Sequence, residues 1–122
     1  MQQLDIGSAH STTVWVMDDV GPGGAHHRYE ITPSAAAPTV LEVMIPISVQ
    51  FQYGPVGEAG VNGGHHEDLL AIVIHRLQCF QAGPYACHDN ALALTYLKIA
   101  LQCLNHRTAD RERRGVEGTS AV

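Results

Sequence analysis

Hydrophobic and polar positions change their spacing near the middle of the chain. Two runs rich in β-branched and aromatic residues, 12–18 and 26–32, flank the glycine-rich segment DVGPGGA, a pattern typical of a hairpin with a longer loop. A third such run covers 39–53, and Pro46 within it favours an edge position or a bulge. The first half therefore predicts a small antiparallel sheet of about three strands.

The second half has helical spacing. A first helix is indicated by acidic residues in its opening turn, Glu67 and Asp68, where the helix dipole favours them. Its apolar positions are Leu69, Val73, Leu77 and Phe80. This periodic stretch ends at the segment AGPYACHDN, which breaks the helix.

A second, longer helix follows, with a stop signal at Gly115. It extends over about 25 residues, roughly 37 Å at the helical rise per residue. Its leucines recur at 3-4-3 spacing: Leu94, Leu97, Leu101 and Leu104. The two helices are expected to form an antiparallel hairpin.

Together these elements predict an α+β fold in which a sheet precedes a two-helix hairpin. The 122 residues are enough for one domain and too few for two substantial ones. Within the single domain 1–122 we expect a sheet part at 10–58, a helical hairpin at 62–115 and a tail at 116–122.

The second helix is apolar on more than one side. Charged residues make up only 16% of the chain, which also suggests that some surface is covered by another molecule. We expect self-association, although the sheet could instead cover this surface. The residues outside the leucine seam are Leu92, Tyr96, Ile99, Ala100 and Cys103.

Apolar runs are too short to cross a bilayer, and the N-terminal segment lacks the pattern of a signal peptide. The three cysteines have no C-x-x-C spacing, and Cys79 and Cys103 lie among helical apolar residues, where a reduced thiol acts as a small hydrophobe. A soluble protein of a reducing cytoplasm is expected.

No sequence motif indicates catalysis, a cofactor or a metal site. The eight histidines match neither H-E-x-x-H nor a zinc-finger spacing, so surface or capping roles are expected. No Ser/His/Asp order, phosphate-binding loop or dinucleotide fingerprint is present. The histidines are His10, His26, His27, His65, His66, His75, His88 and His106.

Arginines cluster near the C-terminal end of a chain whose formal charge is −5. On a helix, Arg107, Arg111 and Arg114 share one stripe and could bind a pyrophosphate through their planar guanidiniums. Alternatively, they are ordinary cations that the helix dipole stabilises. A short basic segment on an acidic body is unlike the broad basic face of a DNA binder.

Phe80 and Asn90 flank the turn at the other end of the hairpin. An aromatic ring can stack on a base, and an Asn can read an adenine edge. Taken singly, Phe80 could equally be core and Asn90 a helix cap. Because this turn is far from the arginines, only two copies packed antiparallel could form one pocket from both ends.

Three segments in order, FQYGPVGEAGVNG, EDLLAIVIHRLQCFQAGPYAC and NALALTYLKIALQCLNHRTADRERRGVEGT, carry a family resemblance. They resemble the phage helical-hairpin domain shared by the first-type Thoeris anti-defence proteins and the anti-CBASS cyclic-nucleotide sponges. The resemblance covers Phe51 to Thr119, and strands before the hairpin resemble the Thoeris branch. Tyr85 and His88 stand where the family leads us to expect Phe and Arg.

The resemblance implies a protein that sequesters glycocyclic ADP-ribose, the messenger of bacterial TIR enzymes, in the cytoplasm of the infected host. It assigns base stacking to Phe80, and contacts to the rest of the ligand to Asn90, Arg107 and Arg111. Arg28, Asp89 and Arg114 are further candidates. It also implies a homo-oligomer, a dimer at least and up to a hexamer, and in some members a separate site for cyclic trinucleotides.

The leading hypothesis is therefore a non-enzymatic sponge for a cyclic nucleotide. Two alternatives from other classes stay open: a small phage enzyme that degrades such a nucleotide, and a small DNA-binding regulator. Neither a nucleic-acid nor a membrane partner is expected.

Overall fold

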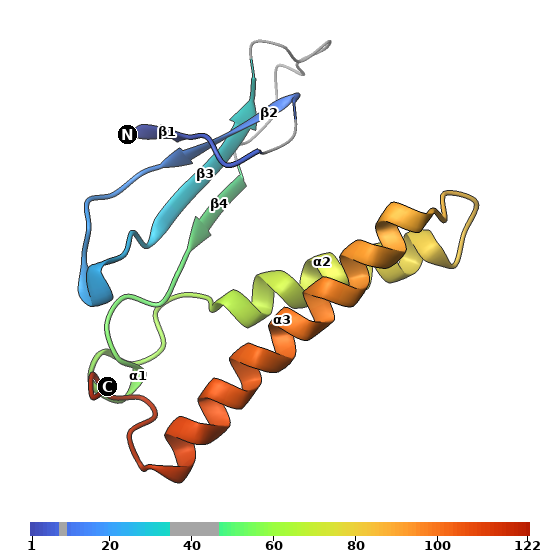
Figure 1. Ribbon diagram of the computed structural model, residues 1–122. Helices are drawn as coiled ribbons and strands as arrows, with labels where there is room; N and C mark the ends of the chain where they lie inside the picture. Colours follow the sequence, from blue (N-terminus) through green and yellow to red (C-terminus); the bar gives the residue numbers. More distant parts are fainter. Residues whose placement is uncertain (8–9, 35–46) are drawn as a thin grey trace. The chain divides into compact units, whose positions relative to one another are not determined.

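The computed structural model describes residues 1–7, 10–34 and 47–122 (Figure 1). One compact unit comprises Met1–Gly54 with Val61–Gly63, and the second comprises Pro55–Gly60 with Gly64–Val122. The first unit holds the sheet and the second holds the helices, so the α+β class predicted from the sequence is confirmed.

The sheet is an antiparallel meander in the order β1-β2-β3-β4. Its strands are β1 (Gln2–Leu4), β2 (Thr12–Val16), β3 (Arg28–Pro33) and β4 (Ile47–Gln50). It has four strands rather than the three expected. The additional strand is β1, which pairs with β2 although its sequence, QQL, carries no strand pattern. Of the predicted strand 39–53, residues 39–46, with Pro46, lie outside the described residues.

Register within the sheet is fixed by side chains on neighbouring strands. Val14 lies opposite Ile31, and the indole Nε1 of Trp15 donates to the hydroxyl of Thr32 over 2.9 Å. The loop between β2 and β3 contains a short 3-10 helix, η1 (Pro22–Gly24). A hairpin with a longer loop, as predicted, therefore joins β2 and β3.

The helical unit contains α1 (Val56–Ala59), α2 (His66–Gln81) and α3 (His88–Arg113). Figure 1 shows α2 and α3 side by side in opposite directions, and the predicted antiparallel hairpin is confirmed. Leu94 is buried, and the other seam leucines of α3 are partly buried. None of the described helices is long and apolar enough to cross a membrane.

The predicted apolar face of α2 is partly wrong. Leu69 and Val73 are exposed, whereas Ile74 is buried and Leu70 and Leu77 are partly buried. The face that α2 packs is therefore shifted by one residue from the predicted one. The error arises because α2 is apolar on several sides, so spacing alone does not select the packed stripe.

Gly115 ends α3, as predicted. Its positive φ of 72° suits glycine, and its N–H donates to the carbonyl of Glu112 while that of Val116 donates to the carbonyl of Arg111. This pair of bonds is a Schellman motif, which caps the last free carbonyls of a helix.

The tail 116–122 folds back onto α1 within the helical unit (Figure 1). The N–H of Gly57 donates to the carbonyl of Gly118 over 2.7 Å. A Cβ at Gly57 would lie 2.5 Å from that oxygen, so only glycine allows this approach.

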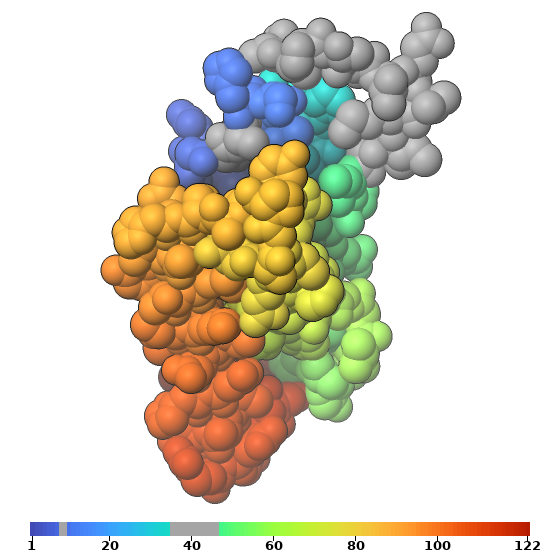
Figure 2. Space-filling model, turned by 90° about the vertical axis from the view of Figure 1, so that its right-hand side faces the viewer, coloured from blue at the N-terminus to red at the C-terminus, as the bar shows by residue number. Residues whose placement is uncertain are grey.

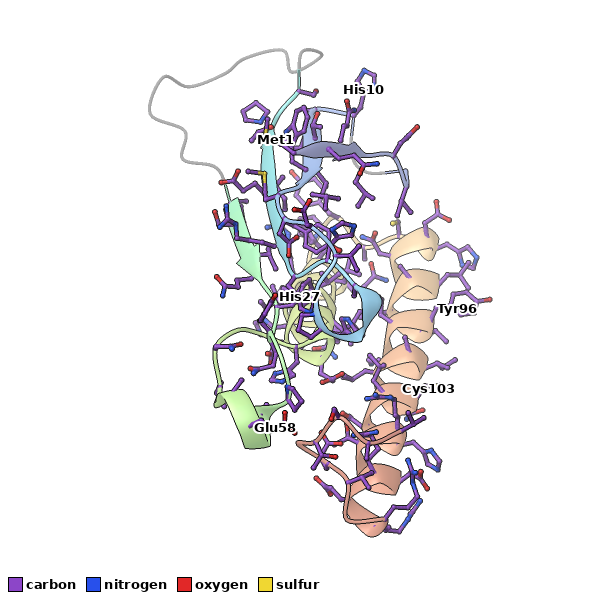
Figure 3. All side chains as sticks on the ribbon, turned by 90° about the vertical axis from the view of Figure 1, so that its left-hand side faces the viewer. Met1, His10, His27, Glu58, Tyr96 and Cys103 are labelled. Atoms are coloured by element: carbon purple, nitrogen blue, oxygen red, sulfur yellow. The ribbon has the colours of Figure 1, made fainter. Side chains whose placement is uncertain are left out.

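Cys79, Cys87 and Cys103 are exposed free thiols. The expectation that Cys79 and Cys103 pack as small hydrophobes is therefore wrong, because both lie off the seam between the helices. In Figure 3, Cys103 lies on the outer side of α3, as does Tyr96, whose ring points away from the helix.

Candidate functional site

Phe80 lies in the last turn of α2, at the end of the hairpin that appears in yellow and orange in Figure 2. Its ring is half-buried and contacts Tyr85 edge-to-face, with centroids 6.2 Å apart. The guanidinium carbon of Arg76, one helical turn earlier, lies 5.3 Å from the ring centroid. Polar and aromatic neighbours of this kind suit a binding surface better than a hydrophobic core.

An open groove of about 660 Å³ runs along the same side of α2. The groove is lined by Ile72, His75, Arg76, Cys79 and Phe80. These positions follow the helical spacing i, i+3, i+4, i+7 and i+8 and share one face of the helix, away from the stripe that packs on α3. Its volume lies within the range of small-molecule sites.

The side chain of Gln81 closes the turn next to Phe80. Its amide nitrogen donates to the carbonyl of Cys87 over 3.1 Å, and its amide oxygen accepts from the N–H of Cys87 over 3.0 Å. A side-chain amide thus replaces a pair of backbone hydrogen bonds. This contact holds the end of α2 beside the start of α3.

Asn90 and Asp89 lie in the first turn of α3. Cys87 is the N-cap residue, since its Sγ accepts from the backbone N–H of Asn90 over 3.4 Å. Asn90 is therefore not the cap, which was the alternative interpretation. Asp89 is exposed, and a carboxylate here is favoured by the helix dipole.

Arg111 is the most constrained arginine of the cluster. Its Nε donates to the carboxylate of Glu117 over 3.0 Å, and its Nη1 donates to the carbonyl of Ala121 over 2.8 Å. Its Nη2 donates to the carbonyls of Val116 and Thr119 over 3.0 and 3.1 Å. Four of the five N–H groups of a guanidinium are thus used by the tail, and only 11% of the side chain is exposed.

Arg113 and Arg114 share one carboxylate. Asp110 lies 3.3 Å from Nη2 of Arg113 and 3.1 Å from Nε of Arg114. The hydrogen bond from Arg113, followed by the charge of Arg114, holds the pKa of Asp110 below its ordinary value despite some desolvation. Arg114 also donates from Nη1 to the backbone oxygen of Val122.

Arg107 differs from these arginines because its exposed side chain forms neither a hydrogen bond nor an ion pair with any other residue in the described part of the chain. It follows His88, the first residue of α3, by 19 positions, or roughly 28 Å along the helix axis. The structure thus keeps Phe80, Asn90 and Asp89 at one end of the hairpin and the arginine cluster at the other.

Arg28 belongs to the sheet unit, where its backbone N–H donates to Asp18 over 3.1 Å. The other carboxylate oxygen of Asp18 accepts from the backbone N–H of His27 over 2.9 Å. Desolvation raises the pKa of Asp18, but these N–H groups and the imidazoles of His26 and His27 together hold it below its ordinary value.

His27 is buried, and the expectation that the histidines lie on the surface or cap helices is wrong for this residue. Its ring packs edge-on against Tyr53, with centroids 5.0 Å apart. Among residues 1–7, 10–34 and 47–122, no three His, Cys, Asp or Glu side chains are grouped to hold a metal ion.

The family model described as Acb2/Tad1, hairpin domain, matches residues 45–109, which is more than half of the chain. The chain belongs to the Acb2/Tad1 hairpin-domain family. The match contains Phe80, Asn90 and Arg107 and ends before Arg111.

A Thoeris anti-defence protein is among the relatives of this chain. The chain is 58% identical over 72 residues to Thoeris anti-defense 1 of Bacillus phage SBSphiJ7. The aligned part covers 59% of this chain and about half of the length of that relative. The resemblance to Thoeris anti-defence proteins is therefore confirmed.

Several residues of the site were not found from the sequence of this Acb2/Tad1 hairpin protein. Arg76 precedes Phe80 by four residues, and this i, i+4 spacing was a signal that could have identified it. Gln81 bonds to the backbone of Cys87 across the turn, and Glu117 bonds to Arg111 from the tail. The sequence carries no local signal for such contacts.

Proposed function

We propose that this protein is a phage anti-defence sponge that binds a cyclic nucleotide made by bacterial TIR enzymes and withholds it without cleavage. The ligand class is glycocyclic ADP-ribose, and the result is a block of Thoeris immunity in the cytoplasm of the infected bacterium. The family match and the Thoeris anti-defence relative support the biological role.

The observation that carries the proposal is the environment of Phe80. Its half-buried ring borders an open groove instead of lying in a core, and a guanidinium stands beside it. Base stacking on an aromatic ring is a common means of holding a nucleotide. We assign this role to Phe80, with Asn90 and Asp89 as neighbouring polar contacts.

The pocket is proposed to be shared between copies of the chain. Phe80 lies beside the turn that precedes α3, whereas Arg107 lies roughly 28 Å along α3 from its first residue, His88, which is more than one small nucleotide can span. Antiparallel packing of two copies would bring the Phe80 end of one to the Arg107 end of the other. We therefore propose a homo-oligomer, a dimer at least, and the family resemblance implies assembly up to a hexamer.

Exposed apolar residues on the outer face of α3 are consistent with this assembly. Tyr96 and Ile99 are 68% and 50% exposed, and Leu92 lies on the same stripe. A stripe of this kind needs cover, and a second copy of the same helix offers the matching surface.

Arginines at the far end of α3 are proposed to hold the phosphates. Arg107 can do so directly because it is exposed. Arg111 can clamp a ligand only if that ligand replaces Glu117 and tail carbonyls, whereas Arg114 is about half exposed and already donates to Asp110 and to the backbone oxygen of Val122. We assign Arg107 the primary role, and we keep Arg28 and a separate site for cyclic trinucleotides as secondary proposals.

Isothermal titration calorimetry with glycocyclic ADP-ribose tests the proposal. We expect tight binding of the cyclic ligand and weaker binding of linear ADP-ribose. Turnover of the ligand during the titration would indicate an enzyme, and binding of duplex DNA alone would indicate a regulator; either result would overturn the proposal.

A further inference from the structure

The groove on α2 combines an apolar wall with groups that can carry positive charge. Ile72, Cys79 and Phe80 supply the apolar surface, and Arg76 and His75 supply the polar one. None of the described residues that line the groove is Asp or Glu. The groove therefore suits a ligand with a flat apolar part and an anionic part.

Arg76 is available for such a ligand in a way that Arg111 is not. In the described part of the chain, its guanidinium forms no hydrogen bond or ion pair, and its central carbon lies over the Phe80 ring, 5.3 Å from the ring centroid. By contrast, four N–H groups of Arg111 are already bonded to the tail. A free guanidinium can donate two parallel hydrogen bonds to a phosphate.

The spacing along α2 matches the size of a nucleotide. Arg76 and Phe80 are four residues apart, so their side chains are neighbours on one face of the helix. A base on Phe80 would carry its ribose phosphate within reach of the Arg76 fork. His75, which also lines the groove, stands beside that position.

We propose that Arg76 is a phosphate-binding residue of the groove and that it acts together with Phe80 on a single adenine nucleotide. This inference rests on the proposed function, because the nucleotide is the messenger assigned above. It adds a cation from the same protomer to the arginines that a second copy would supply. The outer face of α2 thereby becomes a part of the pocket.

The test compares Arg76→Ala and Arg76→Lys with the parent chain, using glycocyclic ADP-ribose and adenosine as probes in calorimetry. Arg113→Ala is the matched control, because it removes an exposed helical arginine outside the groove. We expect Arg76→Ala to lower the affinity for glycocyclic ADP-ribose about ten- to a hundredfold, and Arg76→Lys to restore part of the lost affinity. Adenosine has no phosphate, so its weaker binding should be unchanged.

Melting temperatures of all variants should stay close to that of the parent, since Arg76 is exposed and its guanidinium forms no hydrogen bond or ion pair with any described residue. Equal binding of the cyclic ligand by Arg76→Ala and the parent would overturn the inference and leave the proposed function standing. An equal loss for adenosine would also overturn it, because Arg76 would then act only by orienting Phe80. If the parent binds no nucleotide, both proposals fail.

Discussion

The Nε atom of Arg111 lies 3.0 Å from a carboxylate oxygen of Glu117, six residues later in the chain. The guanidinium therefore already donates hydrogen bonds to a carboxylate and three carbonyls, at the N–H groups that a phosphate of a ligand would need. Any anion that reaches Arg111 has to compete with the tail of the protein itself.

This competition predicts in which direction the ligand affinity changes when a negative charge is removed from the tail. If Arg111 belongs to the pocket, Glu117→Gln should raise the affinity for glycocyclic ADP-ribose by up to about fivefold, because it removes the competing ion pair. Calorimetry measures the change. Unchanged affinity would assign Arg111 to holding the tail alone.

Arg111→Ala provides the counterpart to that experiment. Loss of the tail contacts should lower the free energy of unfolding by about 1–3 kcal/mol and speed proteolysis of residues 116–122. Arg107→Ala is the control, because its exposed side chain has no partner in the described residues and its removal should leave the tail protected.

Phe80→Ala separates a binding role from a core role. We expect the affinity for the cyclic ligand to fall by about 1–3 kcal/mol, because the stacking surface is lost, with little change in melting temperature. Leu94→Ala is the contrasting variant, since Leu94 is buried and its truncation should cost about 2–5 kcal/mol of stability. If Phe80→Ala lowers the melting temperature as much as Leu94→Ala does and leaves the ligand affinity intact, Phe80 is a core residue.

Tyr96→Glu tests the shared pocket. A charge on the exposed stripe of α3 should convert the oligomer to a monomer, as measured by light scattering, and should lower the affinity for the cyclic ligand in parallel. Asn105→Asp adds one negative charge to α3 away from that stripe and should leave the assembly intact. A parent chain that is monomeric at micromolar concentration would contradict the shared pocket.

Asp18 makes the stability of the sheet unit depend on pH. Because its pKa is lower in the folded state, its carboxylate stabilises the fold above the ordinary range for Asp, and this contribution disappears as the pH falls through the lowered pKa. Below about pH 4 the parent should lose stability more steeply than Asp18→Asn. Trp15, the single tryptophan, provides the fluorescence signal, and parallel curves would contradict this role for Asp18.

Long periodic segments were predictable from the sequence because many residues repeat the same signal. The leucines of α3 and the stop at Gly115 are examples. β1 was missed because a three-residue strand with two glutamines has no pattern to detect and forms only by pairing with β2. The packed stripe of α2 was misassigned because Leu69 and Val73 are as apolar as the residues that α3 covers.

The site was less predictable because its contacts depend on folding at a distance. The stripe containing Arg107, Arg111 and Arg114 follows from helical spacing, but its electrostatic state does not. The tail determines it by placing Glu117 on Arg111 and the backbone oxygen of Val122 on Arg114. Such contacts between a side chain and distant carbonyls leave no spacing pattern in a sequence.

The most direct test of sequestration is to incubate the purified protein with glycocyclic ADP-ribose, remove free ligand, denature the protein and identify what is released. We expect the folded protein to retain the ligand and to release it chemically intact. Release of an altered nucleotide would mean that the protein is an enzyme. Absence of any retained nucleotide would contradict the claim that this hairpin protein binds the messenger at all.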